Sequence, residues 1–309
     1  MSSELADRIA RLTGLPVRSV RPVGAQHGYQ HLEITFADGT RGFGKVSASG
    51  SARAAASVLP TNPENGGGRA FAAEANGLRW LAEARAVPIP EVLGADDSAL
   101  IISMIAVDSA IPGAASQVSG QAAHRFGADL ARLHAAGADS FGAPWPGVIA
   151  SLPLDNTPGE SWPEWYAEHR LRPFLRLAAS AGLLHDEDVS LVEAVINRLA
   201  SLAGPPEPPS RIHGDCWSGN ILWSGGRGWL IDPAAHGGHR ETDLAMLALF
   251  GAPYLSAALE GYTETAPLAA GWQDRVPLHQ LHPLLVHVCL FGESYRSAVC
   301  AAARSALST

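Results

Sequence analysis

Hydrophobic residues near the start of the chain recur first at helical spacing and then at strand spacing. Leu5, Ile9 and Leu12 fall on one face of a helix, so the pattern predicts a helix over residues 4–13. Asp38-Gly39 lies between two alternating stretches and is typical of a hairpin turn. The alternation predicts three strands, which span Val17–Val23, Tyr29–Phe36 and Arg41–Val46.

A change of composition separates these strands from the next element. Residues 49–69 are rich in Ser, Ala, Gly, Asn and Pro, so we expect a mobile surface loop there. Helical spacing returns over Phe71–Ala84 and ends before Pro88-Ile89-Pro90. The apolar run Ala99–Ile102 predicts a buried strand. We therefore expect the first part of the chain to be an antiparallel sheet with one helix packed on it.

The rest of the chain is mostly helical in pattern. Helices are predicted at Gln121–Ala136, Trp162–Ala181 and Glu187–Leu202, with further helix toward the C-terminus. A strand, a loop and a hairpin are predicted over about residues 211–232. The expected fold class is α+β, with a sheet-rich lobe at residues 1–104 and a mostly helical lobe at residues 105–309. Ligands favour the cleft between two such lobes.

Composition narrows the classes of function. The chain has 309 residues, of which 47% are hydrophobic, and this is enough apolar material for a real core. Its net charge of −8 argues against nucleic acid or an anionic membrane as a partner. We find no signal peptide and no apolar run close to the roughly 18 residues of a membrane span, so we expect a cytoplasmic protein. The three cysteines form no CxxC pair, which disfavours a disulfide framework and a thiolate zinc site.

Lysine occurs once in the chain, at Lys45, whereas the other basic residues are all arginine. The single lysine lies at the end of the third predicted strand. A lysine ammonium is a compact charge, and an arginine guanidinium is a planar fork, so the two are not interchangeable at a binding site. The alternative is a surface lysine that is there by chance.

The densest polar segment is residues 213–220, which read His213-Gly214-Asp215-Cys216-Trp217-Ser218-Gly219-Asn220. A further carboxylate, Asp232, follows twelve residues after Asn220 at the end of a predicted strand. Phosphoryl transfer needs oxygen ligands that hold magnesium and a separate acceptor for the proton of the attacking hydroxyl. We therefore predict that Asn220 and Asp232 bind Mg²⁺ and that Asp215 is the acceptor. Lys45 would meet the phosphates of ATP, with Glu74 as its partner.

Each of these residues taken alone has a commoner explanation. A single Asp in a loop is usually a turn or cap residue, and a single Glu on a helix is usually solvated. Coincidence explains less well the full set of five features in this order. They are the single lysine on the third strand, the glutamate on the following helix, the His-x-Asp loop, the asparagine five residues later and the aspartate at the strand end.

Two motifs resemble those of the fructosamine kinase family, which has the two-lobed protein-kinase-like fold also found in aminoglycoside and choline phosphotransferases. Residues 213–220 are similar to the family pattern HGDxWSGN. The more specific motif is Ile231-Asp232-Pro233-Ala234 followed by Gly238-His239-Arg240-Glu241-Thr242-Asp243-Leu244-Ala245-Met246, which is similar to IDPA…GHRExDLAM. The resemblance extends from about Val17 to Phe291.

The resemblance implies an ATP-dependent kinase that phosphorylates the third-carbon hydroxyl of fructosamine- or ribulosamine-type ketoamines. It implies that the backbone near Ser103 and Met104 binds adenine, and that Asp243 braces the catalytic loop. It implies a sugar site formed by four residues, Trp217, His239, Arg240 and Glu241. The resemblance leaves two pairs of alternatives open: a small-molecule or a protein-bound ketoamine, and a monomer or a homodimer.

Two other functions stay open at this point. One is a small-molecule kinase of the same fold that acts on an aminoglycoside, a choline-like alcohol or a sugar. The other is a non-catalytic nucleotide-binding protein. We expect Cys216 to have a packing role, because the neighbouring Asp215 disfavours a thiolate. His27 and His31 have no third ligand nearby, so zinc is not expected there, and His279, His282 and His287 are expected to be packing or surface residues.

Overall fold

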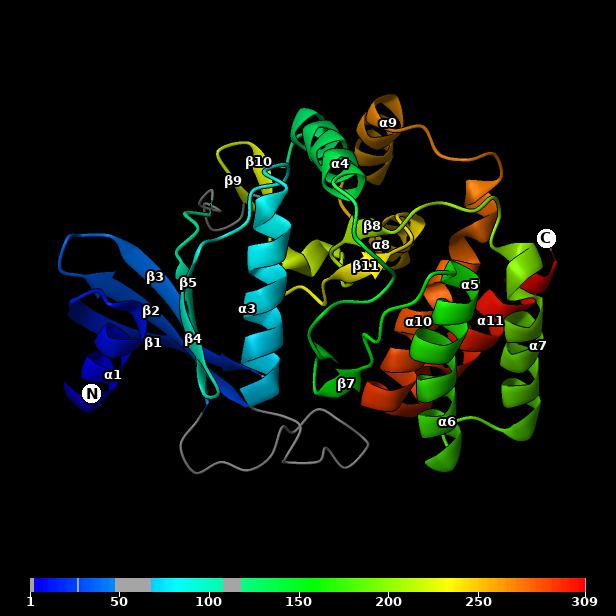
Figure 1. Cartoon of the computed structure of the whole chain (residues 1–309), viewed down its shortest axis with the longest axis horizontal. Helices are drawn as coiled ribbons and strands as arrows, with labels where there is room; N and C mark the ends of the chain where they lie inside the picture. Colours follow the sequence, from blue (N-terminus) through cyan, green and yellow to red (C-terminus); the bar gives the residue numbers. More distant parts are fainter. Residues whose placement is uncertain (1–2, 27, 48–67, 108–117, 309) are drawn as a thin grey trace.

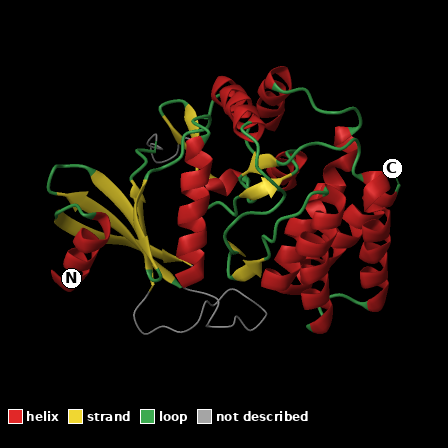
Figure 2. Ribbon diagram, viewed as in Figure 1, coloured by secondary structure: helices red, strands yellow, loops and turns green. Residues whose placement is uncertain are grey.

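The computed structural model describes residues 3–26, 28–47, 68–107 and 118–308. Figure 1 shows a sheet-rich lobe that contains the N-terminus and a helical lobe that contains the C-terminus. Figure 2 shows the same division, with most strands at one end and most helices at the other. The α+β, two-lobed prediction is therefore confirmed. The predicted loop at residues 49–69 lies largely outside the described residues, as does His27.

One five-stranded antiparallel sheet forms the N-terminal lobe, in the order β1-β2-β3-β5-β4. Its strands are β1 (Val17–Gln26), β2 (Tyr29–Phe36), β3 (Arg41–Ser47), β4 (Val92–Asp96) and β5 (Ala99–Ser103). The predicted Asp38-Gly39 turn is confirmed, because Asp38 Oδ1 accepts hydrogen bonds from Thr40 and Gly39 has φ of +88°. The sequence pattern did not predict β4.

Two helices, rather than the one predicted, cover this sheet. Helix α1 (Ser3–Thr13) packs on one face, and α3 (Gly68–Glu83) packs on the other. Alternation along β3 decides which side chains meet which helix, because successive residues point to opposite faces. Val46 packs with α1, whereas Phe43 packs with α3. Lys45 shares the parity of Phe43, so it lies on the α3 face.

Helices make up most of the C-terminal lobe, and their largest hydrophobic core joins α5–α7 to α10 and α11. The helices are α4 (Gly120–Ala135), α5 (Trp162–Tyr166), α6 (Arg172–Ser180), α7 (Asp186–Leu202), α8 (Glu241–Leu249), α9 (Leu255–Thr265), α10 (Trp272–Phe291) and α11 (Arg296–Leu307). Three two-stranded ladders complete the lobe, β6 (Gly147–Ile149) with β7 (Leu152–Leu154), β8 (Ser210–Ile212) with β11 (His236–Gly238), and β9 (Ile221–Ser224) with β10 (Arg227–Leu230).

The single helix predicted over Trp162–Ala181 is divided in the structure. A π-helical turn, η1 (Ala167–Leu171), separates α5 from α6. Pro173 has no N–H, so it cannot donate to the carbonyl of His169. The Arg170 guanidinium donates to that carbonyl instead, at 2.9 Å. The proline therefore accounts for the break, and Arg170 satisfies the oxygen that the proline leaves free.

A second proline changes the hydrogen bonding inside α10. Pro283 cannot donate to the carbonyl of His279, four residues earlier. The Tyr166 hydroxyl lies 3.2 Å from that carbonyl oxygen and 3.1 Å from that of Leu278, and it accepts a bond from the N–H of His282 at 3.3 Å. Tyr166 thus replaces backbone bonds that the helix lacks. The half of α10 beyond Pro283 leads toward the catalytic loop, as shown below.

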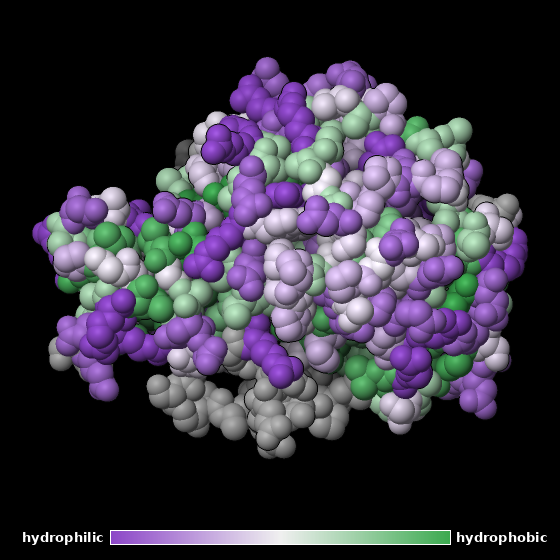
Figure 3. Space-filling view, viewed as in Figure 1, coloured by the Kyte–Doolittle hydropathy of each residue, from purple (hydrophilic) through white to green (hydrophobic). Residues whose placement is uncertain are grey.

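On the face shown in Figure 3, hydrophilic residues are spread over both lobes between smaller hydrophobic groups. Within the described ranges, no helix is both long enough and apolar enough to cross a membrane. The division between the lobes at residue 104 remains a prediction.

Candidate active site

Three charged side chains join the two lobes. Lys45 Nζ lies 2.9 Å and 3.1 Å from the two carboxylate oxygens of Glu74, and 2.6 Å from Oδ1 of Asp232. Glu74 is three residues after Phe71 and four before Leu78, which both pack on the sheet, so it projects from the same face of α3. The structure therefore brings together the lysine, its predicted partner and the strand-end carboxylate.

Burial and charge together set the protonation of this group. Burial lowers the pKa of Lys45, but Glu74 and Asp232 outweigh it and shift that pKa upward. Burial raises the pKa of Glu74 to about 7, although Lys45 opposes the shift. Burial also raises the pKa of Asp232, and here the nearby Lys45 prevails and the net shift is downward. One ammonium thus faces two carboxylates, and the surplus negative charge suits a site that receives cations.

The backbone at Asp232 is held in a conformation that residues other than glycine seldom adopt. Its φ is +54°, in the left-handed region. Such strain persists only where the surrounding structure fixes it, and it is common at functional sites. Here Ile231 donates to the carbonyl of Asn220 at 3.1 Å, and Pro233 packs under Gly77 of α3. A Cβ on Gly77 would lie only 3.2 Å from Pro233, so the glycine permits this close approach.

The fully buried carboxylate of Asp243 holds the predicted catalytic loop in place. Asp243 accepts hydrogen bonds from the N–H groups of His213 at 2.7 Å and Gly214 at 2.9 Å. It also lies 3.1 Å from Nε2 of His134, whose other ring nitrogen contacts the Tyr262 hydroxyl at 2.8 Å. The bracing role implied for Asp243 agrees with this geometry. No spacing in the sequence singles out His134 or Tyr262, because they lie more than 15 residues from any motif.

His213 braces the same loop through both ring nitrogens. Nε2 lies 2.9 Å from the carbonyl oxygen of Ile231, so it must donate, and Nδ1 accepts from the N–H of Asp215 at 3.3 Å. Burial lowers the pKa of His213, which keeps the ring neutral in this arrangement. His213 therefore links the loop that carries Asp215 to the segment that follows β10 and carries Asp232.

Asp215 and Asn220 contact each other across the loop. The Asn220 amide donates to Oδ2 of Asp215 at 2.8 Å and to its carbonyl oxygen at 2.9 Å. Burial raises the pKa of Asp215 to about 7; Asn220 opposes the shift, and the charges of Asp232 and Asp243 add to it. A carboxylate with a pKa near the working pH suits general base catalysis.

The donor atoms of Asn220 and Asp232 fit magnesium. Because Nδ2 of Asn220 is occupied by Asp215, its amide oxygen is the atom left to bind a cation. Asp232 uses Oδ1 for Lys45, which leaves its second oxygen. Amide and carboxylate oxygens are hard ligands of the kind that Mg²⁺ prefers, and the carbonyl of Asp232 also lies 3.5 Å from the Asn220 amide nitrogen.

Two N–H groups of the segment predicted to bind adenine are already used within the N-terminal lobe. The N–H of Met104 donates to the carbonyl of Arg41 at 3.0 Å, so it belongs to the sheet. The Ser103 N–H is likewise used, by the carbonyl of Glu91 at 2.8 Å. Ile105 is the first residue after β5 whose N–H donates to none of the described residues. A free backbone N–H for adenine is therefore found at Ile105, and the adenine contact predicted for Met104 stays a prediction.

Trp217 belongs to the catalytic loop and lies at the surface of the protein. Its side chain is 37% exposed, and its indole covers Gly219 so closely that a Cβ there would lie 2.2 Å from the ring. The edge of the ring meets Phe250 at a centroid distance of 6.0 Å. The exposed face of Trp217 is thus available to a ligand two residues from Asp215.

The other three residues predicted for the sugar site, His239, Arg240 and Glu241, take part in a network of ion pairs. Both carboxylate oxygens of Glu241 bind the Arg275 guanidinium, at 2.6 Å and 2.9 Å, and Glu241 is only 2% exposed. Arg240 binds Glu207 through two bonds of 2.6 Å, and His239 is 4% exposed. None of the described contacts of His239, Arg240 or Glu241 reaches Asp215 or Asp232. The structure shows bracing contacts for these residues, and their implied part in the sugar site stays a prediction.

Cys216 is fully buried in the hydrophobic cluster beneath the catalytic loop. Burial raises the pKa of its thiol well above the ordinary value, and Asp243 and Asp215 add to the shift. This environment agrees with the predicted packing role.

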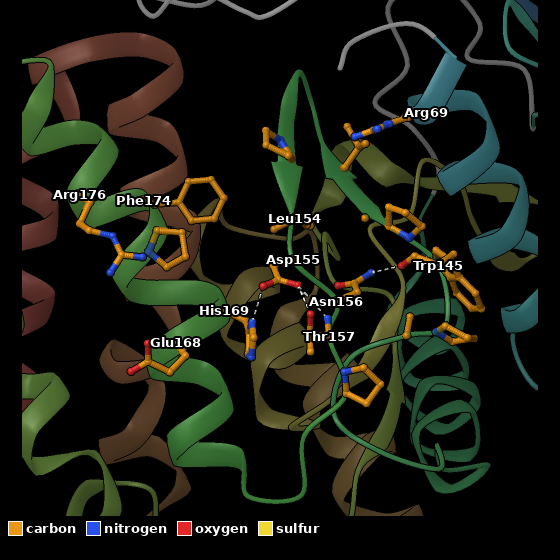
Figure 4. Close-up of a pocket in the computed structure, with 18 residues that line it drawn as sticks. Arg69, Trp145, Leu154, Asp155, Asn156, Thr157, Glu168, His169, Phe174 and Arg176 are labelled. Carbon is orange, nitrogen blue, oxygen red and sulfur yellow. Dashed lines mark hydrogen bonds and ion pairs between the residues drawn. The ribbon is translucent and has the colours of Figure 1, made fainter. Parts of the chain in front are cut away.

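A separate cavity of about 680 Å³ lies between α3, the β6–β7 hairpin and α6 (Figure 4). Its wall includes Arg69, Trp145 and Phe174. The polar groups on it are partly paired within the chain, since His169 Nδ1 lies 2.8 Å from Asp155 and the Asn156 amide donates to the carbonyl of Trp145 at 3.3 Å. None of the predicted site residues lines this cavity.

The family model and the curated relatives that this chain matches agree on one family. The family model for fructosamine kinase matches residues 58–309. The Escherichia coli K12 protein named "Probable ketoamine kinase YniA" is 34% identical over 225 residues, which cover 72% of this chain and 75% of that protein. A Synechocystis protein named as a ketoamine kinase is 33% identical over 234 residues, 73% of this chain and 75% of its own length.

Solved structures agree at the level of the whole chain. A crystal structure from Thermobifida fusca, described as a fructosamine-3-kinase, is 48% identical, covers 100% of both chains and has a TM-score of 0.89. A macrolide 2'-phosphotransferase from Brachybacterium faecium is 18% identical, covers 97% of this chain and 96% of its own, and has a TM-score of 0.58, so it shows the shared fold alone. The motifs, the geometry and these similarities agree, and the chain is a kinase that belongs to the fructosamine kinase family.

Proposed function

We propose that this kinase transfers the γ-phosphate of ATP to the third-carbon hydroxyl of a ketoamine, the product of a sugar and an amine. The observation that carries the proposal is the meeting of Lys45 and Glu74 from one lobe with Asp232 from the other. Asp215 and Asn220 are tied to the same group through the loop and the strand that follows it. This is the donor and acceptor set that phosphoryl transfer to an alcohol requires.

Each residue has a distinct part in the proposed reaction. Asp215 accepts the proton of the attacking hydroxyl and orients its oxygen toward the γ-phosphate. Lys45, held by Glu74, neutralises phosphate charge, and it leaves its 2.6 Å contact with Asp232 as the nucleotide enters. Mg²⁺, held by Asn220 and Asp232, would supply charge neutralisation at the β- and γ-phosphates. Most of the acceleration then comes from positioning and electrostatics.

The relatives named as ketoamine kinases and the structure described as a fructosamine-3-kinase support the choice of substrate. The macrolide and aminoglycoside phosphotransferases among the structural neighbours share less than 20% identity and support only the fold. We therefore propose a ketoamine and not an antibiotic as the acceptor.

A substrate panel tests this proposal. ADP release is measured with fructosamine, ribulosamine and erythrulosamine, and with an aminoglycoside, choline and a free sugar for comparison. Turnover of at least one ketoamine, abolished by Asp215→Asn and accompanied by phosphate on the third carbon by NMR, is the expected result. Turnover of only a non-ketoamine acceptor, or binding of ATP without any turnover, contradicts it.

A further inference from the structure

A row of contacting rings leads away from the catalytic loop. Trp217 meets Phe250 at a centroid distance of 6.0 Å, and Phe250 meets His287 at 5.1 Å. His287 in turn stacks on Phe291 at 5.3 Å and on Tyr295 at 4.8 Å. These five residues, which we call the aromatic wall, come from the catalytic loop, the end of α8, the last turns of α10 and the short helix η3 (Gly292–Tyr295).

Helix geometry explains why the wall is continuous. His287 and Phe291 are four residues apart on α10, so they lie on the same face of the helix. The chain turns at Gly292, which has φ of +81°, and η3 returns Tyr295 to the same rings. His287 is the centre of the wall, because it contacts three of the other four members.

Both ends of the wall are exposed to solvent although they are hydrophobic. Phe291 is 46% exposed and Trp217 is 37% exposed. They are two of five large hydrophobic residues that are exposed in the described ranges, and the others are Val23, Val107 and Tyr254. Exposed aromatic residues that form a connected surface are typical of a binding site.

His287 is held in a form that suits a cationic ligand. Its Nδ1 lies 2.7 Å from the carbonyl oxygen of Pro283, so Nδ1 carries the proton and Nε2 is left as an acceptor. Burial lowers the pKa of His287, which keeps the ring uncharged at neutral pH. A neutral ring does not repel the secondary ammonium of a ketoamine.

The chemistry of the substrate connects the wall to the reaction. In a ketoamine the amine is on the first carbon, two carbon–carbon bonds from the hydroxyl on the third carbon. When that hydroxyl is placed at Asp215, the nitrogen and its substituent must therefore lie close to the loop. Trp217, two residues from Asp215, is the inner end of the wall, and the rings beyond it continue outward.

We propose that the aromatic wall binds the amine-bearing part of the ketoamine, and that the enzyme prefers amines that carry an aromatic or large apolar group. This inference rests on the proposed function. It assigns Trp217 to the sugar side and Phe291 with Tyr295 to the substituent on nitrogen. Phe291 is then a specificity residue that contacts only part of the substrate.

Two ketoamines of the same sugar test the inference, fructosyl-methylamine and fructosyl-benzylamine. They share the sugar and the ammonium and differ only in the group that would meet the outer wall. We expect kcat/KM of the wild type to be about five- to tenfold higher for the benzyl compound, the size of one good aromatic contact. Phe291→Ser should remove this preference by lowering kcat/KM for the benzyl compound while leaving the methyl compound within about twofold.

A matched control and the contrary results complete the design. Tyr254 is also exposed, at 54%, and none of the described ring contacts joins it to the wall; Asn tolerates its positive φ, so Tyr254→Asn should keep the preference. Equal kcat/KM for both ketoamines in the wild type, or an equal loss for both in Phe291→Ser, overturns the inference and leaves the proposed function intact. Absence of turnover of either ketoamine by the wild type overturns the proposed function itself and the inference with it.

Discussion

Two charged groups in this protein contain similar residues but differ in their charge balance. The group between the lobes has one cation, Lys45, facing Glu74 and Asp232, with Asp215 close by. The group behind the catalytic loop is two matched pairs, Arg240 with Glu207 and Arg275 with Glu241. Both groups carry residues that the sequence motifs mark, so the motifs alone do not distinguish them.

The pKa values express this difference. Burial raises the pKa of Asp215 and of Glu74 to about 7, because too few cations are present to offset it. Burial also acts on Glu241, but His279 and Arg275 more than offset it and bring its pKa to about 2. A carboxylate that lacks full compensation can take a proton or a metal ion, whereas a compensated one serves to hold the fold. The comparison shows that the balance of charges distinguishes a group that takes part in the reaction from one that stabilises the fold.

The largest expected effect is on turnover when the unbalanced group loses its base. Asp215→Asn should lower kcat by roughly 10²–10⁴-fold, because the amide cannot accept the proton of the hydroxyl. Steady-state ADP release with a ketoamine measures it, and ATP affinity should change little. Turnover within threefold of the wild type would remove Asp215 from its role.

The balanced group should instead control stability. Glu241→Gln leaves the buried Arg275 guanidinium without its counter-charge, so unfolding free energy should fall by about 3–5 kcal/mol. Urea denaturation at pH 7.5 measures this change. At a temperature where the variant stays folded, kcat should remain near that of the wild type.

A double variant tests whether the loss of stability comes from the unpaired charge of Arg275. Glu241→Met with Arg275→Met replaces both charges by apolar groups, and much of the lost stability should return. If Glu241→Gln instead abolished turnover while leaving stability unchanged, Glu241 would belong to the substrate site as the sequence motif first indicated.

The pH dependence should follow the unbalanced group. Asp215 must be deprotonated to act, and burial raises its pKa and that of Glu74 to about 7, so kcat/KM should fall as the pH drops below about 7 with a slope of one to two protons. The Glu241 pair should add nothing in this range, because its pKa is about 2. A profile that stays flat down to pH 5.5 would contradict the assignment.

The sequence predicted the parts of the site whose order along the chain is informative. Lys45 as the only lysine, the spacing from Asp215 to Asn220, and Asp232 at a strand end are local patterns, and the structure brings these residues together. The sequence could not predict which donor and acceptor atoms are already used in hydrogen bonds within the protein. The Met104 N–H is used by Arg41, and the Arg240 side chain by Glu207, and both partners are set by tertiary packing.

Contacts between residues far apart in the sequence explain most of the remaining differences between the sequence prediction and the structure. His134 contacts Asp243 from a helix 109 residues earlier, and nothing local marks it. His287 was expected to be a packing or surface residue, and its ring contacts with Phe250 and Tyr295 depend on how α10 and α8 meet. In the fold, β4 was not predicted, and α1 adds a second helix to the sheet.

The central claim is that surplus negative charge between the lobes is there to bind magnesium with ATP. The most direct test is a magnesium titration of ADP release in the wild type, Asp232→Asn and Glu241→Gln. We predict that Asp232→Asn requires at least tenfold more Mg²⁺ for half-maximal rate, because it removes a charged ligand, and that Glu241→Gln matches the wild type. Identical titrations for Asp232→Asn and the wild type would contradict the account.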